Sequence, residues 1–241
     1  MLKGDDRLPR YQRLADELRD KVIKGSWRPG DRVPSENELA EEYKIAPGTA
    51  RQAVAQLVGE EILERLHGKG TFVRRPSFDR SLFRFFRFRT DSGETSIPES
   101  RILRRTLEPA PGYVIRKLNL PEGSDAIALT RVRLIDGKPV LLEQIWLPTS
   151  PFQPILEMPD SEFGPLLYPI YDRECGALVA RAEEDLTAEA ARPETARILR
   201  LEEGDPLIVI DRLAFGYDDQ PLEWRRSRGR ADQFSYHTEI R

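Results

Sequence analysis

The sequence predicts an α+β fold with two domains joined by a linker. Residues 1–76 carry apolar side chains at helical spacing and contain clear helix-start signals. Residues 101–241 instead alternate apolar and polar side chains in paired runs, which is typical of antiparallel hairpins. Between them, residues 77–100 are rich in turn formers and hydroxyl groups. We therefore expect a mainly helical domain over residues 1–76, and a sheet domain over residues 101–241.

The composition is that of an ordinary globular protein. Charged residues make up 33% of the 241 residues and hydrophobic residues 39%. No apolar run approaches the roughly 20 residues that span a bilayer, and residues 1–10 lack the apolar stretch of a signal peptide. One cysteine, Cys175, cannot form an internal disulfide, and with only His67 and His237 we expect no zinc site. We expect a cytoplasmic protein without a cofactor.

An opening helix is predicted over residues 9–25. Apolar residues recur there at helical spacing, and Gly25 is a stop signal. A turn over residues 27–31 then leads to a short extended piece at residues 32–33.

Two short helices joined by a tight turn are predicted next. Ser35 and Glu38 have the spacing of a capping box, which starts the first helix. Residues 45–48 interrupt it, and Pro47 suits the first turn of a second helix that runs to about Glu60. The second helix directs small and hydrogen-bonding side chains outward at its N-terminus. This arrangement indicates a helix-turn-helix.

A β-hairpin is predicted directly after the second helix. Residues 62–66 and 71–73 have strand patterns, and residues 67–70 form a glycine-bracketed turn. The whole chain has a net charge of −3, yet basic side chains gather in the second helix and this hairpin. They are Arg51, Arg65, Lys69, Arg74 and Arg75. A hairpin in this place is a wing, so we expect a winged helix-turn-helix.

Three blocks of this region resemble the winged DNA-binding domain of GntR-family bacterial regulators: residues 32–36, 49–53 and 67–73. The resemblance implies binding to double-stranded DNA by a defined set of residues. These are Arg10, Ser35, Glu36, Asn37, Pro47, Gly48, Thr49, Arg51, Gln52, His67, Gly68 and Lys69. Asn37 stands where other members often have arginine, and Pro47-Gly48 replaces an arginine–threonine pair. Arg51 is therefore expected to carry base recognition.

The predicted linker, residues 77–100, contains an alternation of phenylalanine and arginine over residues 82–89. Such side chains can stack on nucleic acid bases. The preferred interpretation is a half-buried element that packs on the second domain or on a partner subunit.

The C-terminal domain is predicted to contain two similar helix–hairpin units. Strands are predicted over residues 101–107, 126–135, 139–147, 178–186, 207–217, 222–230 and 234–240. Helices are predicted over residues 113–118, 161–174 and 193–201. A weak repeat, residues 120–123 and 201–204, precedes the two hairpins. We expect an antiparallel sheet with pseudo-symmetric halves and helices on one face.

Two arginines of the first hairpin need negative charge nearby. Arg131 and Arg133 share a strand face with Ile127 and Leu129, because strand side chains alternate, and this face is the expected inner one. Buried guanidinium groups require a carboxylate or another anion. Glu143 on the paired strand is one candidate, and a ligand carboxylate or phosphate is another. An internal salt-bridge network of these three residues stays open as an alternative.

The C-terminal domain also resembles the UTRA ligand-binding domain, which defines the HutC subfamily and shares its fold with chorismate lyase. The resemblance rests on residues 130–133, Glu143, 167–168, Glu223 and 230–232. It implies a small anionic effector, commonly a sugar phosphate or an organic acid, and a set of binding residues. These are Phe88, Thr90, Arg131, Arg133, Glu143, Tyr168, Glu223, Arg226 and Arg228.

Two positions depart from the family pattern. Leu166 replaces a serine that contacts phosphate in many relatives, which disfavours a phosphosugar. Arg228 replaces an aromatic residue that often precedes the closing segment. These departures leave the identity of the effector open.

Together the two resemblances imply a ligand-responsive transcription factor, most simply a repressor that a small anion releases from a palindromic operator. A homodimer would place two recognition helices in successive major grooves. Two alternatives stay open: a DNA-binding protein whose C-terminal domain only dimerises, and a lyase-like enzyme. Against the enzyme, the sheet region has no nucleophile–base constellation and no histidine except His237.

Overall fold

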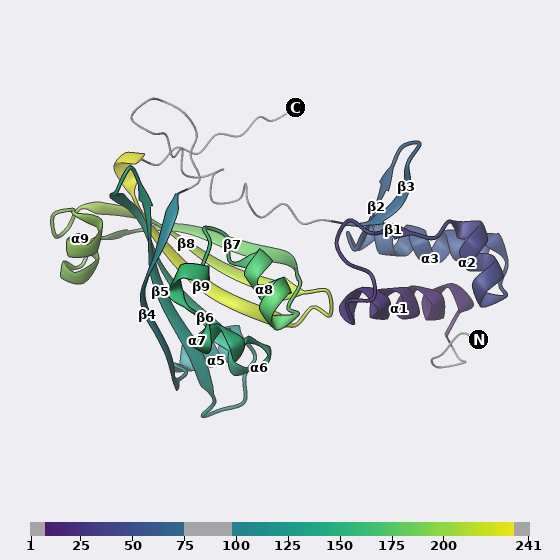
Figure 1. Cartoon of the computed structure of the whole chain (residues 1–241), viewed down its shortest axis with the longest axis horizontal. Helices are drawn as coiled ribbons and strands as arrows, with labels where there is room; N and C mark the ends of the chain where they lie inside the picture. The colour runs from purple at the N-terminus through teal and green to yellow at the C-terminus, as the bar shows by residue number, and fades with distance from the viewer. Residues whose placement is uncertain (1–7, 75–97, 234–241) are drawn as a thin grey trace. The chain divides into compact units, whose positions relative to one another are not determined.

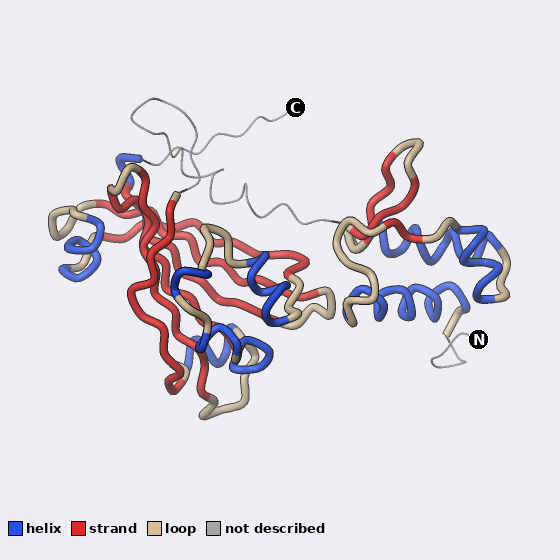
Figure 2. Tube along the Cα trace, viewed as in Figure 1, coloured by secondary structure: helices blue, strands red, loops and turns tan. Residues whose placement is uncertain are grey.

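The computed structural model describes residues 8–74 and 98–233 (Figure 1). The chain divides into two compact units, residues 1–76 and residues 77–241. Helices make up most of the first unit, and one large sheet makes up most of the second (Figure 2). The predicted α+β class is confirmed, with the helical body and the large sheet in separate units.

Three helices form the body of the first unit: α1 (Arg10–Ile23), α2 (Glu36–Tyr43) and α3 (Pro47–Gly59). The predicted capping box starts α2, since the Ser35 side chain accepts a hydrogen bond from the Glu38 amide and the Glu38 carboxylate accepts one from the Ser35 amide. Pro47 lies in the first turn of α3, as predicted. Apolar residues from all three helices form one core. They include Leu14, Leu18, Leu39, Ala50, Val54 and Leu57.

A small antiparallel sheet completes the first unit. Its strands are β1 (Arg32–Val33), β2 (Leu63–Leu66) and β3 (Gly70–Val73), in the order β1-β3-β2. The β2–β3 hairpin projects away from the helices (Figure 1). Gly68 and Gly70 in its turn have φ angles of 71° and 115°, a region that residues with a Cβ rarely adopt. The predicted wing is therefore present.

Six antiparallel strands form the sheet of the second unit, in the order β4-β5-β6-β9-β8-β7. They are β4 (Glu99–Pro109), β5 (Asp125–Ile135), β6 (Lys138–Pro148), β7 (Val179–Ala190), β8 (Pro206–Gly216) and β9 (Pro221–Arg230). β4 begins at Glu99, inside the segment expected to be linker. The two predicted hairpins, β5–β6 and β8–β9, meet where β6 pairs with β9. The centre of the sheet thus joins two similar halves.

Helices cover both faces of this sheet, so the prediction of helices on one face is wrong. They are α5 (Gly112–Lys117), α6 (Thr149–Phe152), α7 (Pro154–Glu157), α8 (Tyr168–Cys175) and α9 (Pro193–Leu199). Segment α6 to α8 packs against the face that carries Ile127 and Leu129 (Figure 1). α5 and α9 pack against the opposite face, near Trp224 and Leu142 respectively. The central strands are buried on both faces and require cover on each.

The predicted helix over residues 161–174 is confirmed only from residue 168 onward. A 3-10 turn covers Asp160–Glu162, and α8 begins only at Tyr168. Gly164 and Pro165 lie between them, and both residue types disfavour a helix interior. α6 and α7 were not predicted because four residues each are too few to show a period. A last 3-10 turn covers Ala231–Gln233, and the strand predicted over residues 234–240 lies outside the described residues.

Candidate functional site

Helix α3 directs its N-terminal hydrogen-bonding side chains outward. Gly48, Arg51 and Gln52 are exposed and Thr49 is half-buried. The opposite side of the helix is buried in the core of the first unit, so its orientation is fixed. Exposed arginine and glutamine are the side chains that read guanine and adenine edges in a major groove. The sequence-based candidates on α3 therefore lie on one solvent-facing surface.

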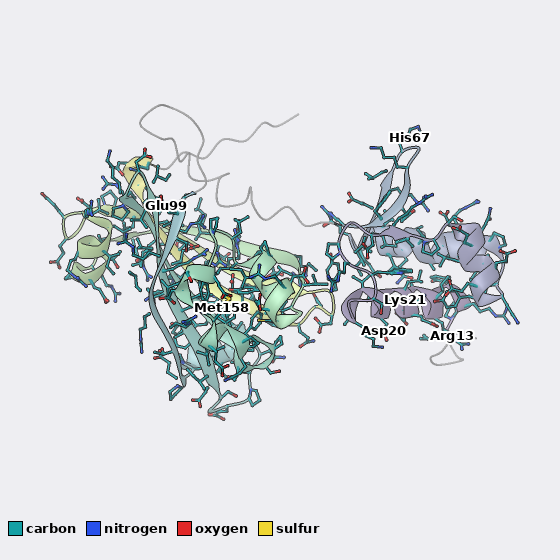
Figure 3. All side chains as sticks on the ribbon, viewed as in Figure 1. Arg13, Asp20, Lys21, His67, Glu99 and Met158 are labelled. Carbon is teal, nitrogen blue, oxygen red and sulfur yellow. The ribbon has the colours of Figure 1, made fainter. Side chains whose placement is uncertain are left out.

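The turn of the wing is equally accessible. His67, Gly68 and Lys69 are all exposed, and Figure 3 shows His67 at the tip of the hairpin. Arg65 on β2 forms an ion pair with Glu36 on α2, with 3.0 Å between Nη2 and Oε1. This contact ties the wing to the first turn of α2.

The other DNA-binding candidates of the first unit lie at the N-terminal ends of its helices. Ser35 caps α2, which gives it a structural role independent of DNA. Asn37 is exposed in the first turn of α2, and Arg10 is exposed at the start of α1. Pro47 is exposed in the first turn of α3.

In the second unit, five charged residues of the sheet form a buried arginine–glutamate cluster. It consists of Arg131, Arg133, Glu143, Glu223 and Arg225. Each is at most 3% exposed. They lie on the sheet face covered by α6 to α8, because Arg131 pairs in register with Glu143 and strand side chains alternate from there. Burial of this much charge is costly unless it is compensated.

Glu143 is the centre of the arginine–glutamate cluster. Its carboxylate accepts hydrogen bonds from Arg131 Nε at 2.5 Å, from Arg225 Nη1 at 3.1 Å and from the Ser227 hydroxyl at 3.4 Å. Burial alone would raise the pKa of Glu143, but the charges of the surrounding arginines outweigh it and hold this pKa well below the ordinary range. Glu143 is therefore ionised at neutral pH.

Glu223 connects the cluster to helix α8. Its carboxylate accepts hydrogen bonds from Arg225 Nη2 at 2.6 Å, from the Tyr171 hydroxyl at 2.7 Å and from the Tyr168 hydroxyl at 3.2 Å. Burial raises the pKa of Tyr171 well above its usual range, so this phenol stays a donor. The Tyr168 hydroxyl also accepts a hydrogen bond from Arg212, which pairs with Glu184. A continuous polar network thus runs from β5 to β7 through α8.

Arg133 has a different environment from its neighbours. It is 3% exposed, and its Nη2 donates to the Pro98 carbonyl at 3.3 Å. Within residues 8–74 and 98–233, no carboxylate lies within ion-pair distance of it. Burial lowers the pKa of Arg133 to about 10, so the group is still charged at neutral pH. Of the internal network considered from sequence, Arg131 and Glu143 form a pair and Arg133 stands outside it.

The sequence placed two residues on the wrong face of the sheet. Arg226 and Arg228 belong to the predicted effector-binding set, but they point to the face opposite Glu223 because adjacent strand residues alternate. Arg226 pairs with Asp211 at 2.6 Å, and Arg228 contacts Glu189 and Gln144 at 2.6 Å each. The remaining two candidates, Phe88 and Thr90, lie outside the described residues.

Sequence reasoning missed four residues that the structure brings to the network: Arg212, Arg225, Ser227 and Tyr171. A signal for two of them was present. Glu223, Arg225 and Ser227 recur with a period of two, which places them on one strand face.

The described residues contain no group of three or more His, Cys, Asp or Glu side chains that could hold a metal ion. In the same part of the chain, no helix is both long and apolar enough to cross a membrane.

Both units match known families. Residues 10–73 match the bacterial regulatory proteins of the gntR family, and residues 94–235 match the UTRA domain. The chain is 30% identical to the HTH-type transcriptional repressor NagR of Bacillus subtilis, over 95% of this chain and 93% of that protein. It is also 30% identical to a probable fructoselysine utilization operon transcriptional repressor of Shigella flexneri, over 88% and 86% of the two chains.

Solved structures agree with these matches. The ligand-binding domain of a GntR-family regulator from Bordetella bronchiseptica is 33% identical, with a TM-score of 0.56 over 60% of this chain and 89% of that domain. PhnF from Mycobacterium smegmatis is 25% identical, with a TM-score of 0.55 over 97% of this chain and 99% of that one. With both domains matched along nearly its whole length, the chain belongs to the GntR family of bacterial regulatory proteins and carries a UTRA domain.

Proposed function

We propose that this protein is a transcriptional repressor that binds operator DNA through its first unit. A small anionic metabolite binds at the arginine–glutamate cluster of the second unit and releases the DNA. The family assignment and the repressors to which the chain is similar support the first part. The relatives named above are regulators, and we accordingly propose regulation rather than catalysis.

For DNA, the supporting feature is the outward surface of α3 together with the wing. Arg51 and Gln52 are exposed on a helix whose other side is fixed in the core. Lys69 adds a positive charge at the wing turn, where a phosphate or the minor groove is within reach of such a hairpin. The protein would bind as a homodimer on a palindromic site, with one recognition helix in each half-site.

The observation that carries the effector proposal is the environment of Arg133. A buried positive charge without a carboxylate partner among the described residues is costly, and an anionic ligand would compensate it. Neighbouring Arg131 and Glu143, and Tyr168 on α8, would complete the binding site. The proposed effector site and the DNA-binding residues belong to different units, so the effector would act by favouring a conformation with lower operator affinity, typically through about 1–3 kcal/mol of coupling.

The test combines DNA binding with ligand release. Fluorescence anisotropy would follow wild-type protein on DNA taken from upstream of its own gene, with metabolites handled by the neighbouring genes as candidate effectors. Arg133→Met should keep operator affinity and the dimer, yet no longer respond to the effector. Arg226→Met is the matched control, because Arg226 lies on the opposite sheet face. Wild-type response to the effector in Arg133→Met would contradict the proposed site.

A further inference from the structure

We infer that the effector carries a single negative charge on an acceptor-only group, a carboxylate, rather than the double charge of a phosphate ester. This inference rests on the proposed function and specifies the ligand class of the same site. Two inventories of the arginine–glutamate cluster define the group: the count of hydrogen-bonding atoms requires an acceptor, and the count of charges favours a monoanion over a dianion.

The charge inventory gives the cluster a net charge of one positive unit. Arg131, Arg133 and Arg225 contribute three positive charges, and Glu143 and Glu223 contribute two negative ones. The adjacent Arg212 is neutralised by Glu184, with 2.7 Å between Nε and Oε1. Among the described residues the excess is therefore one unit, located at Arg133. A monoanion neutralises it, whereas a dianion would leave a net negative charge among buried side chains.

The hydrogen-bond inventory leaves buried donors without partners, whereas every glutamate oxygen of the cluster is already engaged. Each of the four carboxylate oxygens of Glu143 and Glu223 already accepts at least one hydrogen bond. In contrast, Arg131 Nη2, Arg133 Nε and Arg225 Nε are buried and have no hydrogen-bond partner among the described residues. A carboxylate offers two oxygens and about four lone pairs, and it donates nothing. An ammonium group would add donors and a positive charge to a site that already has an excess of both.

The arrangement at Arg133 suits such a group. Its Nε is unpaired, and its Nη2 holds the Pro98 carbonyl at the long end of the hydrogen-bonding range, 3.3 Å. A carboxylate can take both nitrogens in a fork, which is the strong geometry for this pair. Arg133 would then set the charge requirement, and Arg131 and Arg225 would add single donors.

The experiment compares two anions on one carbon skeleton. Full-length protein is titrated with glycerate, with glycerol 3-phosphate and with neutral glycerol, and affinities are taken from the rise in melting temperature. At about pH 8 the phosphate ester is a dianion, because its second pKa is about 6. We expect glycerate to bind at least about ten-fold more tightly than the ester at this pH. Toward about pH 5.5 the ester becomes a monoanion, so its affinity should rise while that of glycerate stays constant.

Variants change the excess charge in a known direction. Arg133→Met removes it, so both anions should lose affinity, while the control Arg226→Met should bind like wild type. Glu223→Gln raises the excess to two and should reverse the preference in favour of the ester at about pH 8. Glu143→Gln makes the same change if the first variant does not fold.

The possible outcomes distinguish failure of this inference from failure of the proposed effector site. If the ester binds more tightly than glycerate at about pH 8, and does so through Arg133, then the site takes dianions: the inference fails and the proposed effector site stands. If neither anion changes the melting temperature, or if Arg133→Met responds like wild type, the cluster is not an anion site and both proposals fail.

Discussion

The two units place their arginines in opposite environments. In the winged unit the basic side chains Arg51 and Lys69 are exposed, so their charges do not destabilise the fold in the absence of DNA. In the sheet unit Arg131 and Arg225 are buried and paired with glutamates, whereas the buried Arg133 has no carboxylate partner among the described residues. An arginine side chain is thus a surface group in the first unit and part of the core in the second. Substitution of these residues should change DNA binding without changing stability in the first unit. In the second unit it should change ligand binding and stability together.

The largest effect should follow removal of the central carboxylate. Glu143→Ala leaves Arg131 with a buried charge that has lost its carboxylate partner and leaves Arg225 with Glu223 alone, and breaking a buried pair in this way typically costs about 3–5 kcal/mol of the free energy of unfolding. Chemical denaturation, followed through the unfolding transition of the second unit, would measure this loss of stability. The matched control is Glu36→Ala, which breaks the exposed pair with Arg65 and should cost at most about 1 kcal/mol. Equal losses for the two variants would contradict the comparison.

The same carboxylate sets a pH dependence. The folded-state pKa of Glu143 lies well below its value in the unfolded chain, about 4.3. Its contribution to stability is therefore complete above about pH 5 and is lost as the pH falls below about 4 toward the folded-state pKa. The difference in stability between wild type and Glu143→Gln, measured by denaturation between pH 7 and pH 3, should be constant above about pH 5 and begin to shrink below about pH 4. If the two stabilities instead differed by the same amount at every pH, Glu143 would not be the carboxylate whose pKa the arginines lower.

The same contrast explains what could be predicted from sequence. The wing and the α2 cap depend on residues a few positions apart, Ser35 with Glu38 and residues 63–73, so their pattern is visible locally. The cluster depends on β6 pairing with β9, which brings Glu143 next to Arg225 across 82 positions of sequence. Alternation identified Arg131 and Arg133, but an error of one residue exchanged Arg225 for Arg226 and so selected the wrong face. Short helices and turns around Pro165 carried no periodic signal at all.

Within the winged unit, the larger effect should come from the helix. Arg51→Ala should remove the expected bidentate contact to a guanine edge, worth about 1–3 kcal/mol of discrimination between operator and random DNA. The melting temperature should stay unchanged, because the side chain is exposed. Competition of operator against random duplex in an anisotropy assay would measure the ratio. Undiminished preference for the operator would show that Arg51 does not read a base.

The smallest effect should come from the wing. Lys69 is exposed in the turn between β2 and β3, where it is expected to meet a phosphate rather than a base edge. Removing one phosphate contact weakens binding to every sequence alike, because the contact carries no sequence information. Lys69→Ala should therefore leave the operator-to-random ratio intact and reduce the slope of log K against log salt by about one unit. A salt titration from about 50 to 200 mM measures this slope for operator and random DNA in parallel. A selective loss on the operator alone would instead make Lys69 a reader of base identity and would give wing and helix the same role.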